Sequence, residues 1–219
     1  VETFAADDAG DVLLDKLDKW LNWADVCVIG CGLSKDEIAY ELLSHTLTSF
    51  DKTIVADADA IHLLARYDEL KDITVARGKN TGKESVIVTP HPGELAALAH
   101  CGIPEVKADR MGVVQKVCKE YGVITVAKDA DTLCMAKGEH TYLNSSGNDG
   151  MSTAGSGDVL AGLIGSFAAR SVRLGKDIYE AVCLAVYVHG LAGDYQAEQN
   201  GKSFMVASDI IEAYKYILK

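Results

Sequence analysis

The sequence has no apolar run of about 18–20 residues, the length that a membrane-spanning helix requires. Its longest candidate, residues 181–192, is interrupted by His189, and we interpret it as a buried helix. Basic residues are also scarce, because 21 Lys and Arg stand against 32 Asp and Glu and give a net charge of −11. A field of that sign repels nucleic acid and anionic membranes, so we predict neither as a partner. A small anion can still bind locally, at backbone amides or a helix N-terminus.

Metal-binding and redox cysteine motifs are absent as well. None of the six cysteines forms a C-x-x-C pair, and Cys27 and Cys31 have no second pair of ligands at zinc spacing. We therefore predict structural thiols in a reducing, cytoplasmic compartment. The sequence begins without a methionine, in polar sequence at Val1, and we expect an upstream segment to be missing.

Short apolar strands alternate with helices along the chain. Strands are expected at residues 26–29, 54–56, 85–88 and 123–127, a hairpin at 133–136 and 141–143, and helices at 34–49, 60–65, from 94, 111–121, 158–170, 178–199 and 208–218. The first helix has the pattern of a capping box, with Ser34 as its N-cap and Glu37 reaching back. Strands separated by helices predict one α/β domain over residues 1–219. We expect a mostly parallel central sheet, helices on both faces and a late antiparallel hairpin.

A glycine-rich segment, Asn144 to Gly165, is the main candidate for a ligand site. At its centre, Gly155-Ser156-Gly157-Asp158 joins a loop of small residues to a helix, whose first-turn amides can donate to an anion. The segment lacks the G-K-[ST] ending of a Walker A loop, and Asp158 stands in place of a cation. We predict that Asp158 is a general base for an attacking hydroxyl. Taken alone, the four residues fit better with a tight turn whose carboxylate complements the helix dipole.

Two further residues follow predicted strands, where open α/β sheets bind ligands. His91 lies between Pro90 and Pro92, and this stiff backbone suits an imidazole presented to a ligand. The alternative is a turn histidine bonded to a carbonyl. Lys128 could neutralise phosphate charge or be a solvated surface lysine. Gly30-x-Gly32 lacks the third glycine of a dinucleotide fingerprint, so we do not predict a Rossmann site.

Four segments together resemble the ADP/ATP-dependent NAD(P)H-hydrate dehydratases, ribokinase-like enzymes that repair hydrated nicotinamide nucleotides. The matching segments are 29–33, 89–95, 128–132 and 147–162, with further likeness at 57–60 and 207–211. The chain departs from the family at Cys31, where proline is usual, and at Ser34, Asp129 and Ala154, where glycine is usual. The family's opening strands and first glycine-rich loop are not in this sequence, so part of the sheet and pocket is expected to be absent.

The resemblance implies ADP- or ATP-dependent dehydration of (6S)-NADHX and NADPHX, with Mg²⁺, by phosphorylation and phosphate elimination. It implies that Asp158 is catalytic and contacts the hydrate, and that Gly32, His91, Pro92, Gly93 and Glu94 bind that substrate. Nucleotide binding is implied for Lys128, Asp129, Ala130, Asp131, Thr132, Asn148, Asp149, Gly150, Met151, Ser152, Thr153, Ala154, Gly155, Ser156 and Gly157.

The His-Pro-Gly-Glu segment resembles the ADP-using branch of the family, and the resemblance also implies a homo-oligomer, a tetramer. Metal ligands are left open. The alternatives are a ribokinase-like kinase for a vitamin-precursor alcohol and a non-catalytic nucleotide-binding module.

Overall fold

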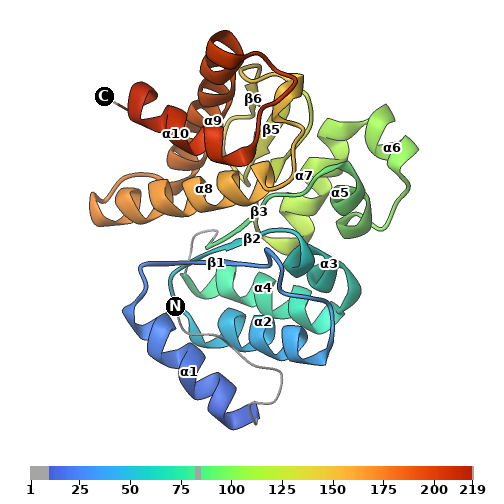
Figure 1. Ribbon diagram of the computed structural model, residues 1–219. Helices are drawn as coiled ribbons and strands as arrows, with labels where there is room; N and C mark the ends of the chain where they lie inside the picture. The colour runs from blue at the N-terminus through green and yellow to red at the C-terminus, as the bar shows by residue number, and fades with distance from the viewer. Residues whose placement is uncertain (1–9, 82–84, 219) are drawn as a thin grey trace.

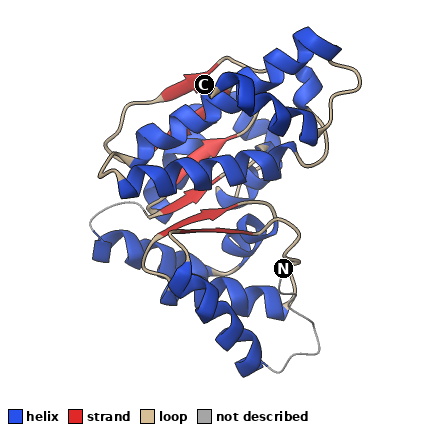
Figure 2. Cartoon of the chain, turned by 60° about the vertical axis from the view of Figure 1, so that its left-hand side comes forward, coloured by secondary structure: helices blue, strands red, loops and turns tan. Residues whose placement is uncertain are grey.

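The computed structural model describes residues 10–81 and 85–218. Within these residues, a sheet of six strands runs through the centre in the order β1-β2-β3-β4-β5-β6 (Figures 1 and 2). The first four strands are parallel, and the last two form an antiparallel hairpin. The strands are β1 (Val26–Ile29), β2 (Thr53–Ala56), β3 (Val86–Val88), β4 (Ile124–Ala127), β5 (Thr132–Met135) and β6 (Tyr142–Asn144). The predicted sheet is therefore confirmed.

Helices cover both faces of the sheet, as predicted. Alternate side chains of a strand point to opposite faces. Ile54 and Ala56 thus join one core, while Val55 between them joins the other. The first core packs on α2 (Glu37–Ser49), α3 (Asp59–Arg66), α4 (Asp68–Thr81), α5 (Pro92–Leu98) and α7 (Arg110–Tyr121). The second packs on α8 (Ser156–Arg173) and α9 (Ile178–Asn200), against which α10 (Ala207–Ile217) lies.

The prediction of Ser34 as a helix N-cap is wrong. Helix α2 begins three residues later, at Glu37, and its N-cap is Asp36, whose side chain accepts from the backbone N–H of Ala39. Ser34 instead has a left-handed backbone, with φ of 77°, and its N–H donates to Asp59 at 3.0 Å. The chain after β1 is therefore tied to the loop after β2 before the helix starts.

Three helices were not predicted: α1 (Gly10–Trp23), α4 and α6 (Ile103–Ala108). Helix α4 has a predominantly polar sequence, but it buries Leu70, Thr74 and Arg77 against its neighbours. In the described part of the chain, no helix is long and apolar enough to cross a bilayer.

The carboxyl ends of the parallel strands meet at one edge of the sheet. Backbone hydrogen bonds tie the residues that follow them together: Asp57 N donates to Ile29 O, and Thr89 N donates to Ala56 O. Beyond β4, Lys128 N donates to Pro90 O at 2.8 Å. Four loops from distant parts of the sequence thereby converge on one place.

Candidate functional site

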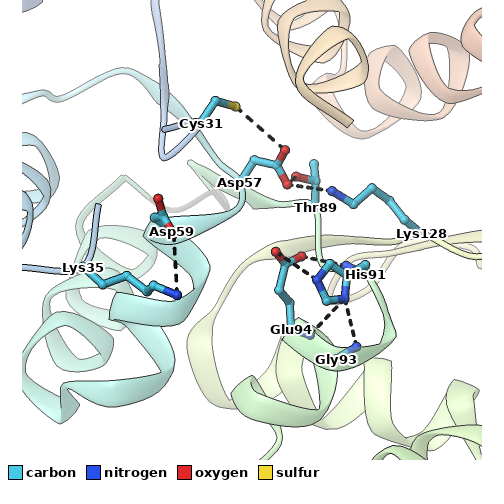
Figure 3. Close-up of polar contacts among 9 residues, drawn as sticks. All are labelled: Cys31, Lys35, Asp57, Asp59, Thr89, His91, Gly93, Glu94 and Lys128. Carbon is cyan, nitrogen blue, oxygen red and sulfur yellow. Dashed lines mark hydrogen bonds and ion pairs between the residues drawn. The ribbon is translucent and has the colours of Figure 1, made fainter. Parts of the chain in front are cut away.

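A buried carboxylate, Asp57, lies at the centre of these converging loops (Figure 3). It follows β2 and is only 1% exposed. One of its oxygens, Oδ1, accepts from the Thr89 hydroxyl at 2.6 Å and from the Lys128 ammonium at 2.7 Å. Because a buried carboxylate needs a compensating charge, Asp57 fixes where the Lys128 ammonium lies. The prediction named Lys128 but not the residue that holds it.

The predicted catalytic residue, Asp158, is next to this centre. It lies in the first turn of α8, and its carboxylate, the Asp57 carboxylate and the Cys31 thiol all lie within 4.8 Å of one another. A side chain built at Gly157 would come within 3.3 Å of Lys128 Nζ, so the ammonium lies against the start of α8. Free amides, a cation and a carboxylate therefore face one space.

The Cys31 thiol extends toward the same carboxylates, with Sγ 3.9 Å from Asp57 Oδ2. Its pKa is raised to about 12, first by burial and then by the negative charges of Asp57 and Asp158. Cys31 is therefore a protonated hydrogen-bond donor in this site and not a nucleophile.

The glycine-rich loop is held in place by helix α9. Asp194 accepts from the Gly147 N–H at 2.8 Å and from the Asn148 amide at 3.0 Å. Asn148 in turn caps the short helix η1 (Asp149–Met151) by accepting from the Gly150 N–H. A methyl group at Gly190 would lie 2.1 Å from Ser146 Oγ, so α9 touches the loop directly. These contacts fix the shape of the loop before any ligand binds.

A buried histidine supports the other end of the loop. His189 of α9 lies between the Ser156 hydroxyl, 3.4 Å from Nε2, and the Tyr214 hydroxyl, 2.9 Å from Nδ1. Burial, helped by the positive charge of Lys128, lowers the pKa of His189 to about 4. His189 is therefore neutral at physiological pH and links α10 to the first turn of α8.

His91 is the N-cap of α5, a local role that was not predicted. Its Nδ1 accepts from the backbone N–H groups of Gly93 and Glu94, and Glu94 accepts from the His91 N–H at 2.8 Å. The imidazole proton of the neutral ring is thus assigned to Nε2, which lies 3.4 Å from Glu94 Oε1. Because the His91 side chain is 55% exposed, Nε2 can still reach a ligand.

The remaining predicted nucleotide contacts separate into two groups. Asp149 to Gly157 form the glycine-rich loop and the start of α8, and Asp149 pairs with Lys202 at 2.7 Å. In the other segment Lys128 points to the centre, whereas Asp129 pairs with Arg110 at 3.3 Å. Thr132 already belongs to β5.

The described part of the site suits a hard divalent cation only in part. The carboxylates of Asp57 and Asp158 offer oxygen, the ligand that Mg²⁺ prefers, but Asp57 is paired with Lys128 and the Cys31 thiol is not a magnesium ligand. A magnesium ion commonly keeps few protein ligands and binds through substrate phosphates. The described residues therefore fit Mg²⁺ that is carried mainly by the phosphates of a nucleotide.

A family model described as NAD(P)H-hydrate dehydratase matches residues 6–215. The chain belongs to this family. The ADP-dependent (S)-NAD(P)H-hydrate dehydratase of Neisseria meningitidis serogroup B is 35% identical over 211 residues, which cover 94% of this chain and 68% of that protein. The bifunctional NAD(P)H-hydrate repair enzyme of Moorella thermoacetica is 35% identical over 212 residues, covering 97% of this chain and 37% of that enzyme. The chain thus spans little more than a third of that bifunctional relative.

Solved structures agree with this family assignment. A ribokinase-like superfamily protein of Enterococcus faecalis superposes with a TM-score of 0.74 at 28% identity, covering 94% of this chain and 67% of that one. The ADP/ATP-dependent NAD(P)H-hydrate dehydratase of Bacillus subtilis, co-crystallised with ATP and Mg²⁺, superposes with a TM-score of 0.73 at 23% identity, covering 89% and 64%. The predicted ribokinase-like fold is confirmed.

The prediction missed four residues that hold the site together. They are Asp57 and Thr89, in the loops after β2 and β3, and His189 and Asp194, both on helix α9. The position of Asp57, directly after a buried parallel strand, was the available clue. His189 and Asp194 lie within a long apolar helix, and no local pattern separates them from ordinary core residues.

Proposed function

We propose that this chain dehydrates hydrated NADH and NADPH at the expense of ADP or ATP, and so restores the reduced nicotinamide nucleotides. The observation that carries the proposal is the position of Asp158, a carboxylate in the first turn of α8 beside the Lys128 ammonium and the free amides of the glycine-rich loop. Amides and a cation suit phosphates. A carboxylate next to them suits a hydroxyl that must lose its proton.

The proposed reaction has two stages. In the first, Asp158 removes the proton from the ring hydroxyl of the hydrate, and that oxygen attacks the terminal phosphorus of ADP or ATP. The bond from this phosphorus to the bridging oxygen breaks, and AMP or ADP leaves. In the second, phosphate leaves the ring carbon while a proton leaves its neighbour, which restores the ring double bond. Phosphorylation thus replaces hydroxide with a better leaving group.

The residues around the loop have distinct parts in this proposal. The amides of Ala154, Gly155 and Gly157 and the Lys128 ammonium stabilise charge on the transferring phosphoryl group. Asp57 keeps the ammonium in position. The proposed Mg²⁺ would be carried by the nucleotide phosphates beside the first turn of α8 and would neutralise their charge. His91 to Glu94 and Gly32 are proposed to contact the hydrate, His91 through Nε2.

Replacing Asp158 by Asn tests the general base. The variant keeps the shape of the side chain but cannot accept the proton, so we expect turnover to fall roughly 10²–10⁴-fold. Nucleotide affinity, measured by titration calorimetry, should stay within a few-fold of the starting protein. Near-normal turnover in Asp158→Asn would show that Asp158 is not the general base.

Two rivals make different predictions for the same purified chain. A kinase for a vitamin-precursor alcohol would accumulate a phosphorylated product and release no phosphate from the hydrate. A non-catalytic nucleotide-binding module would be stabilised by nucleotide on heating without turnover of any kind. Release of inorganic phosphate together with NADH absorbance separates the proposed reaction from both.

We also propose a homo-oligomer in a reducing, cytoplasmic compartment. The compartment is supported by the six cysteines, each of which is a free thiol in the described chain. The oligomer rests on the family resemblance, and light scattering of the purified chain tests it.

A further inference from the structure

A small pocket with basic walls lies beside the proposed substrate contacts. It is lined by Lys35, His62, Leu63, Ala65, Arg66 and Ala97, and has a volume of about 320 Å³. We call it the cationic pocket. Three of its six lining residues are basic and none is acidic, in a chain whose net charge is −11. A local excess of positive charge in so acidic a protein indicates a ligand with negative charge.

Two elements place these side chains together. His62 and Arg66 are four residues apart on α3 and therefore lie on the same face of the helix. Lys35 arrives from the loop after β1, where the Ser34 N–H donates to Asp59 at 3.0 Å. The Lys35 ammonium lies 3.8 Å from Asp59 Oδ1, so the carboxylate holds the loop against α3 while neutralising only part of the charge (Figure 3).

The pocket is built from two segments that also carry proposed hydrate contacts, helix α5 and the loop after β1. Ala97 lies six residues beyond His91 along α5, or about 9 Å at the rise of an α-helix. Gly32 precedes Lys35 by three residues in the other wall. Both α3 and α5 cover the face of the sheet opposite to α8, where the co-substrate nucleotide is proposed to bind. The cationic pocket therefore lies on the side of the proposed substrate contacts and not on the side proposed for ADP or ATP.

Resting on the proposed function, we propose that the cationic pocket binds the ribose 2′-phosphate that distinguishes hydrated NADPH from hydrated NADH. A phosphate monoester carries a charge of about −1.5 to −2 at pH 7. The planar guanidinium of Arg66 can bind two of its oxygens at once, and Lys35 and His62 add donors. The pocket then makes the 2′-phosphorylated hydrate the preferred substrate.

The test compares both hydrates in the purified full chain and in the variant Lys35→Gln/Arg66→Gln. We expect kcat/KM for hydrated NADPH to fall about tenfold or more, because charge-assisted hydrogen bonds to phosphate are lost. For hydrated NADH it should stay within about twofold, since only the phosphate contact is lost. Turnover of hydrated NADH in the variant also shows that it folds. Lys176→Gln, which removes one charge beyond the far end of α8, is the control and should change neither value.

The remaining outcomes overturn the proposal. An equal loss for the two hydrates would assign the pocket to the pyrophosphate that both contain. Unchanged values for both would show that it binds no part of the substrate. If the starting chain turns over neither hydrate, the proposed function fails instead. Inhibition constants for NADP⁺ and NAD⁺ would then test phosphate binding in the cationic pocket independently. Only inhibition by NADP⁺ should weaken in the double variant.

Discussion

The Lys128 ammonium lies 2.7 Å from the Asp57 carboxylate, although the two residues are 71 positions apart in the sequence. The Asp57 side chain is 2% exposed and the Lys128 side chain is 21% exposed, so the burial of the pair is unequal. An ion pair of this kind positions its more accessible member. Here that member is the cation that faces the first turn of α8.

Unequal burial predicts unequal losses of stability. Lys128→Met leaves the deeply buried carboxylate of Asp57 without its cation and should cost about 3–5 kcal/mol of unfolding free energy. Asp57→Asn leaves an ammonium that can reach water, and should cost about 1 kcal/mol. The double variant should regain most of the stability that Lys128→Met loses. All three should lose at least about tenfold in turnover, because the cation is missing or misplaced.

Chemical denaturation and steady-state kinetics measure the two effects separately. Equal destabilisation by the two single variants would show that the pair is not buried as the structure has it. Recovery of activity in the double variant would show that Lys128 has no part in the reaction.

His91 offers a way to separate capping from substrate binding. His91→Asn supplies a side-chain oxygen that can accept from the N–H groups of Gly93 and Glu94, so the unfolding free energy should change little. His91→Ala removes the cap and should cost about 1 kcal/mol. If Nε2 contacts the hydrate, both variants raise KM for it by about tenfold. A normal KM in His91→Asn would limit His91 to its capping role.

A single methyl group tests the contact between α9 and the glycine-rich loop. Gly190→Ala places its Cβ 2.1 Å from Ser146 Oγ, and relief of that clash should cost about 1–3 kcal/mol and shift the loop. We expect the nucleotide KM to rise about tenfold. Gly162→Ala is the matched control, since no atom lies within 4 Å of its Cβ, and it should stabilise α8 by about 0.5–1 kcal/mol. Similar behaviour of the two variants would contradict the contact.

His189 predicts how stability depends on pH. Its pKa is about 4 in the folded chain and 6.5 in the reference state, so the unfolded chain binds a proton that the folded chain excludes. Stability is therefore full above pH 6.5 and falls as the pH drops toward 4, by about 3 kcal/mol in total from this group. His189→Gln should lose this part of the pH dependence. Denaturation curves between pH 4 and 7 would measure it, and an identical slope in the variant would refute it.

Much of the fold could be predicted because its determinants are local. Alternation of short apolar strands with helices identified the sheet, and the hairpin of residues 133–136 and 141–143 was predicted from its turn at Lys137-Gly138. Helix α2 was predicted with the wrong N-cap. Ser34 and Asp36 both precede Glu37 closely, and the choice between them depends on a contact with Asp59. Helix α4 was missed because it buries Arg77 as well as apolar residues.

The site was predicted less completely than the fold. The loop at Gly155-Ser156-Gly157-Asp158 and the lysine at position 128 have recognisable sequence contexts, and the structure brings them together. The residues that hold this loop and this lysine in place have no recognisable sequence context. Asp57, His189 and Asp194 act across separations of 71, 33 and 47 residues, respectively, and such contacts exist only once the sheet has formed.

The Cys31 thiol in this site resists oxidation and alkylation. Thiol oxidants and alkylating agents react with the thiolate, and partial burial of the sulfur, together with the charges of Asp57 and Asp158, raises the pKa of Cys31 and keeps it protonated. Here an exposed cysteine lies at the centre of the site, yet the partial burial of its sulfur and the charges around it keep the thiol protonated.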